Sequence, residues 1–133
     1  KMILTPTYHV MEMYNVHQDA TMIPVAVQSP NYIIGKDTLK AVSVSASVDK
    51  NGETHVSLVN IDPVKNNAVT IDLGNAAFKK VGGRILVSGK LQDYNSFDNP
   101  QKIKPAVFPG AVLKNNSLTI PLPPASVVVL TLQ

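Results

Sequence analysis

Two hydrophobic periodicities divide this chain, a helical one over its first nineteen residues and an alternating one over the remainder. Near the start, Tyr8, Val10, Met11 and Tyr14 recur at a spacing that places their side chains on one side of an α-helix. From Ala20 onwards, apolar residues come in short runs separated by Gly, Pro, Asn and Asp, which is typical of strands and turns. The pattern predicts one N-terminal helix followed by an all-β region.

The predicted helix has a clear beginning but too much apolar surface for an isolated element. The Thr5 hydroxyl can cap the first turn, and Pro6 suits the first helical position because its missing N–H needs no partner there. Met13 and Val16 add apolar side chains on the far side, so the helix needs cover over most of its surface. A helix of about a dozen residues is too short to be stable alone in water. We therefore expect part of its covering surface to lie outside this chain.

The most regular part of the β region is a predicted hairpin. Residues 42–48 alternate apolar side chains with serines, as in an antiparallel strand with one buried and one solvated face. Gly52 ends a turn at 49–52, and residues 54–60 return as the second strand. The run 127–132 is almost continuously β-branched, which favours a central strand buried on both faces.

Five further segments complete the predicted set of strands. Pro24 confines the apolar stretch 21–27 to an edge strand or a bulge, because proline cannot donate to a strand ladder. Asn115 and Asn116 tolerate left-handed backbone angles and are predicted to join two paired strands. The other segments are strands at 68–73, 83–88, 106–114 and 117–122, a long connection at 28–38 and a polar loop at 94–105. Short strands with turns between them and no intervening helix favour an all-β, antiparallel β-sandwich of jelly-roll or immunoglobulin-like type.

Composition narrows the class of protein without identifying a site. A chain of 133 residues with 44% hydrophobic content is one globular domain with enough apolar residues for a continuous core. Its net charge of +3 comes from scattered cations without interleaved aromatic residues, which disfavours nucleic acid as a partner. The longest apolar run, 125–132, is far too short to span a membrane. The absence of cysteine excludes disulfides and thiolate chemistry, and leaves open whether a bacterial protein of this kind is cytoplasmic or exported.

The titratable residues do not form a recognisable catalytic or metal-binding pattern. His9 and His17 lie too far apart along one helix to share a metal ion, and we interpret both as polar or interface residues. His55 is out of phase with the apolar residues of its strand, so we expect it to face solvent. Residues 49–53 superficially resemble a calcium loop, but the glycine comes too early and the later glutamate is missing. We therefore predict no catalytic, metal-binding or cofactor-binding residue.

A sugar-binding surface would need exposed aromatic rings, and the chain offers few. It contains no tryptophan, and the candidates outside the helix are Tyr32, Tyr94, Phe97 and Phe108. The loop at 95–100 is the best candidate for a ligand or domain contact, because it sets an aromatic ring among amides and an acid. The alternative interpretation is a loop that packs only against itself.

Several motifs in order along the chain resemble the C-terminal region of α-L-arabinofuranosidases of glycoside hydrolase family 51. One is an Asn-x-Phe-x-x-Pro loop, and another is a closing strand that begins Leu-Pro-Pro-Ala-Ser-Val. The segments that carry the resemblance are residues 4–10, 13–14, 17–18, 44–47, 57–60, 95–100 and 122–130. The resemblance is specific because it keeps its order over nearly the whole chain.

The resemblance implies that this chain is one part of a divided enzyme. In that family a (β/α)-barrel carries two catalytic glutamates and is followed by a jelly-roll β-sandwich. Residues 1–19 would be the last helix of the barrel and residues 20–133 the C-terminal sandwich, with a further strand contributed by the extreme N-terminus of the parent. Glu12 and Glu53 match neither catalytic motif, so the fragment is expected to be inactive. The residues expected at the interface with the missing barrel are Tyr8, Met11, Tyr14 and Phe97.

The function implied for the parent is the retaining hydrolysis of terminal α-L-arabinofuranosyl residues from arabinan or arabinoxylan. This domain would then pack against the barrel and support it, in a parent that is expected to be a homo-oligomer. An alternative is an autonomous carbohydrate-binding module that uses Tyr94 and Phe97. A generic adhesion-type sandwich is disfavoured, because a helix precedes the strands and the loop motif matches the hydrolase family.

Overall fold

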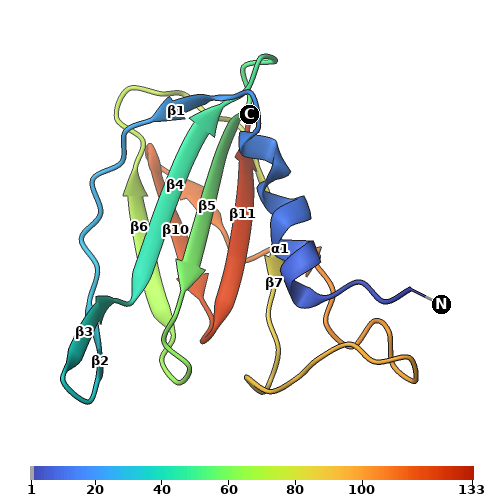
Figure 1. Ribbon diagram of the computed structural model, residues 1–133. Coiled ribbons are helices and arrows are strands. Elements are labelled where there is room, and N and C mark those ends of the chain that lie inside the picture. The colour runs from blue at the N-terminus through green and yellow to red at the C-terminus, as the bar shows by residue number, and fades with distance from the viewer. Residues whose placement is uncertain (1) are drawn as a thin grey trace.

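Residues 2–133, which the computed structural model describes, form one helix followed by a two-layer β-sandwich (Figure 1). The chain runs through α1 (Pro6–Tyr14) and the 3₁₀ turn η1 (Asn15–His17) before the first strand. The strands are β1 (Thr21–Ile23), β2 (Asn31–Ile34), β3 (Asp37–Lys40), β4 (Val42–Val48), β5 (Thr54–Asn60), β6 (Asn67–Asp72), β7 (Val81–Leu86), β8 (Ala106–Val107), β9 (Val112–Lys114), β10 (Ser117–Leu122) and β11 (Ser126–Leu132). The predicted all-β class with one N-terminal helix is confirmed.

The two layers differ in size, and every strand pair is antiparallel. The larger sheet has the order β1-β4-β5-β11-β7-β8, and the smaller has the order β6-β10-β9. In Figure 1 the larger sheet faces the viewer, the smaller one lies behind it, and the separate β2–β3 hairpin projects at the lower left. The first three residues of the predicted stretch 21–27 form β1 at one border of the larger sheet, and the strand ends before Pro24.

The core fills the space between the sheets, and β11 is its central strand. β11 pairs with β5 on one side and β7 on the other, as the run 127–132 predicted. Its Val128, Leu130 and Leu132 point into the core and are fully buried. From the same sheet, β4 and β5 add Val42, Val56 and Leu58 to the core. From the opposite sheet, β10 adds Leu118, Ile120 and Leu122. Burial of apolar side chains from both layers is the main source of stability for such a domain.

The two predicted turns form as the sequence indicates. At the β4–β5 turn, Asp49 Oδ1 accepts hydrogen bonds from the backbone N–H groups of Asn51 (2.8 Å) and Glu53 (3.1 Å). Gly52 takes a φ of 83°, which costs glycine little. Asn115 and Asn116, with φ values of 51° and 56°, join β9 to β10. Both positions have residue types that adopt left-handed angles readily.

Two predicted segments are wrong. The expected connection at 28–38 contains most of a β-hairpin, β2–β3, which turns at Gly35 with a φ of 59°. Most of its side chains are exposed, so it lacks the alternating pattern by which a strand is recognised. The expected single strand at 106–114 is two strands, because the chain crosses from the larger sheet (β8) to the smaller one (β9) at Pro109 and Gly110.

The helix is shorter than predicted and is partly covered by its own chain. Thr5 caps it as expected, since its Oγ1 accepts a hydrogen bond from the Tyr8 N–H at 3.1 Å. α1 lies on the outer face of the larger sheet, beside β11 and β7 (Figure 1). Met13 is only 1% exposed and packs in a second apolar cluster with Leu86, Ile103 and Val129. The chain itself therefore covers this side of the helix, and the expectation of cover from outside applies to the other side.

Gly83 in β7 gives a direct test of how closely the central strands pack. A Cβ atom on Gly83 would lie 2.5 Å from Leu130 Cδ2 and 3.2 Å from the Val129 carbonyl oxygen, whereas one on Gly82 would meet nothing within 4 Å. We expect Gly83→Ala to lower the free energy of unfolding by about 1–3 kcal/mol through overpacking. Gly82→Ala should change it by less than about 0.5 kcal/mol. Urea denaturation measures both, and equal midpoints would contradict the described packing.

Candidate domain interface

The side of α1 that faces away from the sheet exposes large apolar side chains. Tyr8 is 50% exposed and Met11 is 70% exposed, whereas Tyr14 is half-buried beside the apolar cluster of Met13. Phe97 is also exposed, but it lies on the separate loop between β7 and β8. The structure therefore places Tyr8 and Met11 on one exposed helical surface and turns Tyr14 towards the sheet.

An ion pair fastens the middle of α1 to β7. Arg84 donates from Nη1 and Nη2 to the two carboxylate oxygens of Glu12, each at 2.8 Å. These hydrogen bonds hold the pKa of Glu12 below its usual value and raise that of Arg84. Because both side chains are almost half exposed, solvent screens this pair and limits its contribution to stability. Its two parallel hydrogen bonds still fix the direction in which the helix lies.

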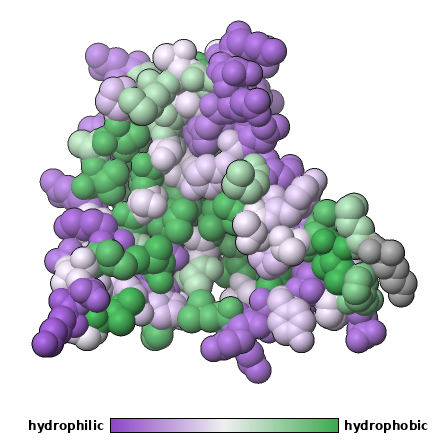
Figure 2. All heavy atoms as spheres, in the orientation of Figure 1, coloured by the Kyte–Doolittle hydropathy of each residue, from purple (hydrophilic) through white to green (hydrophobic). Residues whose placement is uncertain are grey.

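A hollow of about 690 Å³ opens beside the N-terminal half of α1. Its lining mixes apolar side chains with charged ones and comes from the N-terminal segment, the helix, β7 and the loop before β8: Met2, Leu4, Tyr8, His9, Glu12, Arg84, Pro100, Gln101, Lys104 and Pro105. Figure 2 shows hydrophobic residues on this side of the molecule, where the N-terminal segment lies at the right of the view. An apolar hollow with charged groups at its margin has the composition of a protein contact surface.

The loop that carries Phe97 is held by a buried amide. Asn95 Nδ2 donates to the carbonyl oxygens of Leu4 and Ile103, both at 2.8 Å, and its Oδ1 accepts from the Ile103 N–H at 2.7 Å. The loop is thus closed on itself and tied to the segment that precedes α1. Tyr94 and Phe97, on either side of this anchor, remain exposed. Sequence motifs located the loop, but nothing in them showed that Asn95 is its structural centre.

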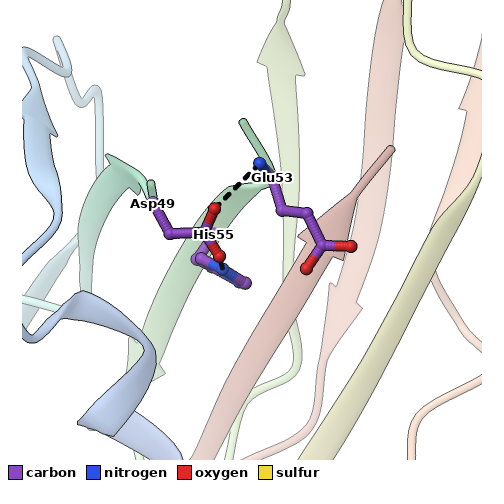
Figure 3. Close-up of side chains that lie close together, drawn as sticks. All are labelled: Asp49, Glu53 and His55. Carbon is purple, nitrogen blue, oxygen red and sulfur yellow. Dashed lines mark hydrogen bonds and ion pairs between the residues drawn. The ribbon is translucent and has the colours of Figure 1, made fainter. Parts of the chain in front are cut away.

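Asp49, Glu53 and His55 form a compact group at the β4–β5 turn (Figure 3). The expectation that His55 faces solvent is wrong, because His55 is only 5% exposed. His55 Nε2 donates to Asp49 Oδ2 at 3.0 Å, and Nδ1 lies 3.1 Å from Thr131 Oγ1. The hydrogen bond from His55 is the main cause that holds the pKa of Asp49 below its usual value. The alternation along the strand predicts the correct sheet face for His55. It does not predict that other segments cover that face.

These three side chains are of the types that bind a divalent metal ion, with one donor atom from each lying within 4.8 Å of the others. The donor atoms, however, already have protein partners. Both Asp49 oxygens accept hydrogen bonds, both His55 nitrogens have partners, and Glu53 accepts from the side chain of Gln133. An ion would have to replace these contacts, so the geometry favours a hydrogen-bond network. The absence of a metal site stays a prediction.

The described residues contain no helix that is long and apolar enough to cross a membrane. Glu12, one of the two glutamates, is engaged by Arg84, and the other, Glu53, lies in the turn just before β5. The structure thus offers contact surfaces more clearly than a reaction centre. That no residue of this chain is catalytic remains a prediction.

A family model described as the α-L-arabinofuranosidase C-terminal domain matches residues 1–126. An intracellular exo-α-L-arabinofuranosidase from Bacteroides ovatus is 42% identical over 134 residues, which cover 100% of this chain and 26% of that protein. The crystal structure of the GH51 arabinofuranosidase from Xanthomonas axonopodis pv. citri is 36% identical, with a TM-score of 0.97, over 100% of this chain and 27% of that one.

A thermostable GH51 α-L-arabinofuranosidase from Thermotoga petrophila shares the fold, with a TM-score of 0.80 at 19% identity over 98% of this chain and 29% of that one. This chain therefore spans about a quarter of the length of the relatives it matches. The similarity extends over both the helix and the sandwich, because the matches to the Bacteroides and Xanthomonas proteins each cover the whole chain. The chain belongs to the α-L-arabinofuranosidase C-terminal domain family.

Proposed function

We propose that this chain is the non-catalytic C-terminal domain of a retaining α-L-arabinofuranosidase that removes terminal α-L-arabinofuranosyl residues from arabinan or arabinoxylan. Its role is to pack against the catalytic barrel and support it. Family membership and the greater length of the relatives support the parent activity. The observation that carries the supporting role is the exposed apolar side of α1, with Tyr8 and Met11 pointing away from a sheet that already holds Met13.

In this proposal α1 is an element shared by two domains. Residues 1–19 are the terminal helix of the barrel, and residues 20–133 are the sandwich. One side of the helix is buried on the sheet through Met13, and the other side, with Met11, is open. A short helix that exposes large apolar side chains is expected to bury them against a partner, because water contact with such surface is unfavourable.

The hollow beside Tyr8 extends this surface towards the β7–β8 loop. Met2 and Leu4 supply apolar lining, and Lys104 supplies positive charge, since the charge of Arg84 is paired with that of Glu12. A barrel surface with an apolar projection and nearby acidic groups would complement it. We also propose that the parent is a homo-oligomer, which the exposed apolar side chains of the β2–β3 hairpin support: Ile33, Ile34 and Leu39.

A second candidate function, an autonomous carbohydrate-binding module, is favoured by one observation. Tyr94 and Phe97 are both exposed on a loop that Asn95 fixes in place. Fixed, exposed rings are the usual means by which proteins stack on sugar faces. The rings are few, and no tryptophan is present, so we rank this function below the supporting role.

The supporting role predicts that the exposed helix surface matters in the parent but not in the isolated chain. Tyr8→Asp combined with Met11→Asp should lower the thermal inactivation midpoint of the parent markedly, because charges would be buried at the barrel contact. In the isolated chain, the same pair should change the free energy of unfolding by less than about 0.5 kcal/mol. Activity on an aryl arabinofuranoside gives the first measurement, and calorimetry gives the second.

Val64→Asp is the matched control, because Val64 is also largely exposed but lies on the β5–β6 connection, outside α1 and the hollow beside it. It should leave the midpoint of the parent unchanged. The unmodified chain alone should show no turnover of the aryl arabinofuranoside. A parent that tolerates both aspartates as well as it tolerates Val64→Asp would contradict the proposed contact.

The anchoring of the β7–β8 loop predicts a large effect at one asparagine. Asn95→Ala removes three hydrogen bonds and leaves buried backbone groups of Leu4 and Ile103 without that partner. We expect the free energy of unfolding to fall by about 2–3 kcal/mol, as measured by urea denaturation. Asn99→Ala, an exposed change in the same loop, should be nearly neutral. Equal effects of the two substitutions would show that the loop does not depend on Asn95.

The two candidate functions predict opposite results in a sugar titration. The supporting role predicts no saturable heat when arabino-oligosaccharides are titrated into the isolated chain. The binding-module function predicts saturable binding that Tyr94→Ala and Phe97→Ala abolish, while Tyr32→Ala, a half-buried ring on β2, leaves binding unchanged. Saturable binding with this dependence on the two loop rings would replace the supporting role as the preferred function.

A further inference from the structure

The end of the helical segment is fastened to the larger sheet by a polar contact. His17, the last residue of η1, lies between two serines of neighbouring strands. Its Nδ1 is 2.6 Å from Ser47 Oγ on β4, and its Nε2 is 2.6 Å from Ser57 Oγ on β5. Both serines are buried. The alternating pattern of residues 42–48 had placed Ser47 on the solvated face of its strand. His17 thus occupies the space that these small side chains leave on the outer face of the sheet.

This contact suits a neutral imidazole. A neutral histidine has one ring N–H donor and one ring acceptor, and each serine hydroxyl can turn to donate or to accept. Both ring nitrogens therefore have a complementary partner. Protonation makes both nitrogens donors and adds a positive charge to a partly buried contact. Burial is the main cause that lowers the pKa of His17, and the charge of His55 lowers it further.

The groups that face His17 do not provide a compensating negative charge. From the helix, Tyr14 contacts its ring edge-on at a centroid distance of 5.7 Å, and burial raises the pKa of Tyr14, so it stays neutral. The titratable group that faces His17 from β5 is His55, whose charge opposes a charge on His17. Asp49, just beyond the end of β4, accepts its hydrogen bonds from His55 and from backbone N–H groups of the turn. A charged His17 would therefore meet another histidine before it met a carboxylate.

The other attachments of the helix do not change in mildly acidic solution. Met13 does not titrate. Glu12 remains ionised and paired with Arg84, because the pKa of Glu12 lies below its ordinary value. Between about pH 5 and about pH 7.5, histidine is the side chain that normally changes charge. Among the described contacts of the helical segment with the sheet, His17 is the one that does so.

We propose that His17 is a pH-sensitive latch that holds the end of the helical segment on β4 and β5 when neutral and releases α1 when protonated, while the sandwich stays folded. The direction follows from linkage. A histidine whose pKa is lowered by folding stabilises the docked state above its unfolded value of about 6.5, and this contribution is lost as the pH falls below that value. The latch concerns only the contact of the helix with its own sheet, so it does not depend on the proposed barrel contact.

Amide hydrogen exchange of the intact 133-residue chain tests the latch. After correction for the intrinsic pH dependence of exchange, protection over residues 6–17 should fall between about pH 7.5 and about pH 5 in the wild type. The loss should reach about tenfold for each unit by which the two pKa values differ, while β5 and β11 keep their protection. In His17→Gln, protection of the helix should not depend on pH, because glutamine offers one donor and one acceptor but does not titrate.

Two matched variants separate His17 from the other histidines. His9→Gln changes a histidine on the helix that contacts neither serine, and His55→Gln changes the histidine next to the latch. Both variants should keep the loss of helix protection in acid. The proposal is overturned if wild-type helix protection does not depend on pH, or if the loss disappears in His55→Gln and persists in His17→Gln. If His17→Gln does not fold, NMR titration of the wild type decides. The chemical shifts of the helix amides must change over the same pH range as those of the His17 ring. A His17 ring that titrates without a change in the helix amides overturns the latch.

Discussion

The structure depends on a central strand, β11, that is buried against the smaller sheet on one face and covered by the helix on the other. β11 is paired on both edges, and its inner side chains fill the space between the sheets. Its outer side chains, Val127 and Val129, would face water without the helix. Met13 of α1 supplies that cover, together with Leu86 and Ile103. The helix therefore covers the outer face of β11, just as the sheet covers one side of the short helix.

This mutual cover explains why α1 is better regarded as a two-sided element than as a detached remnant. The helix uses one side for the sheet, and the ion pair of Glu12 with Arg84 fixes its direction. The opposite side, with Tyr8 and Met11, remains apolar and open. A helix that is held rigidly on one domain and exposes apolar side chains on its other side can present a preformed contact surface, which lowers the entropic cost of docking. The proposed supporting role rests on this arrangement.

The sequence predicted those features for which one local pattern decides the structure. The Thr5 cap, the β4–β5 hairpin and the buried strand β11 each follow from residues close together in the chain. The β2–β3 hairpin was missed because its side chains are mostly exposed and carry no alternation. His55 was placed on the correct face but wrongly called solvated, since what covers a sheet face comes from distant segments. The same limit hid Asn95, whose three hydrogen bonds join the loop to the N-terminal segment.

The outer face of the larger sheet is divided into an apolar and a polar half, and the division has a physical consequence. At the apolar half, Met13 and Val129 can slide with little loss, because dispersion contacts are not directional. At the polar half, His17 must meet Ser47 and Ser57 at hydrogen-bond distance, which is possible only at one position of the helix. Apolar burial therefore provides most of the attraction, and the polar contact fixes the register. Because an unmade buried hydrogen bond costs more than a made one contributes, the helix docks in that register or not at all.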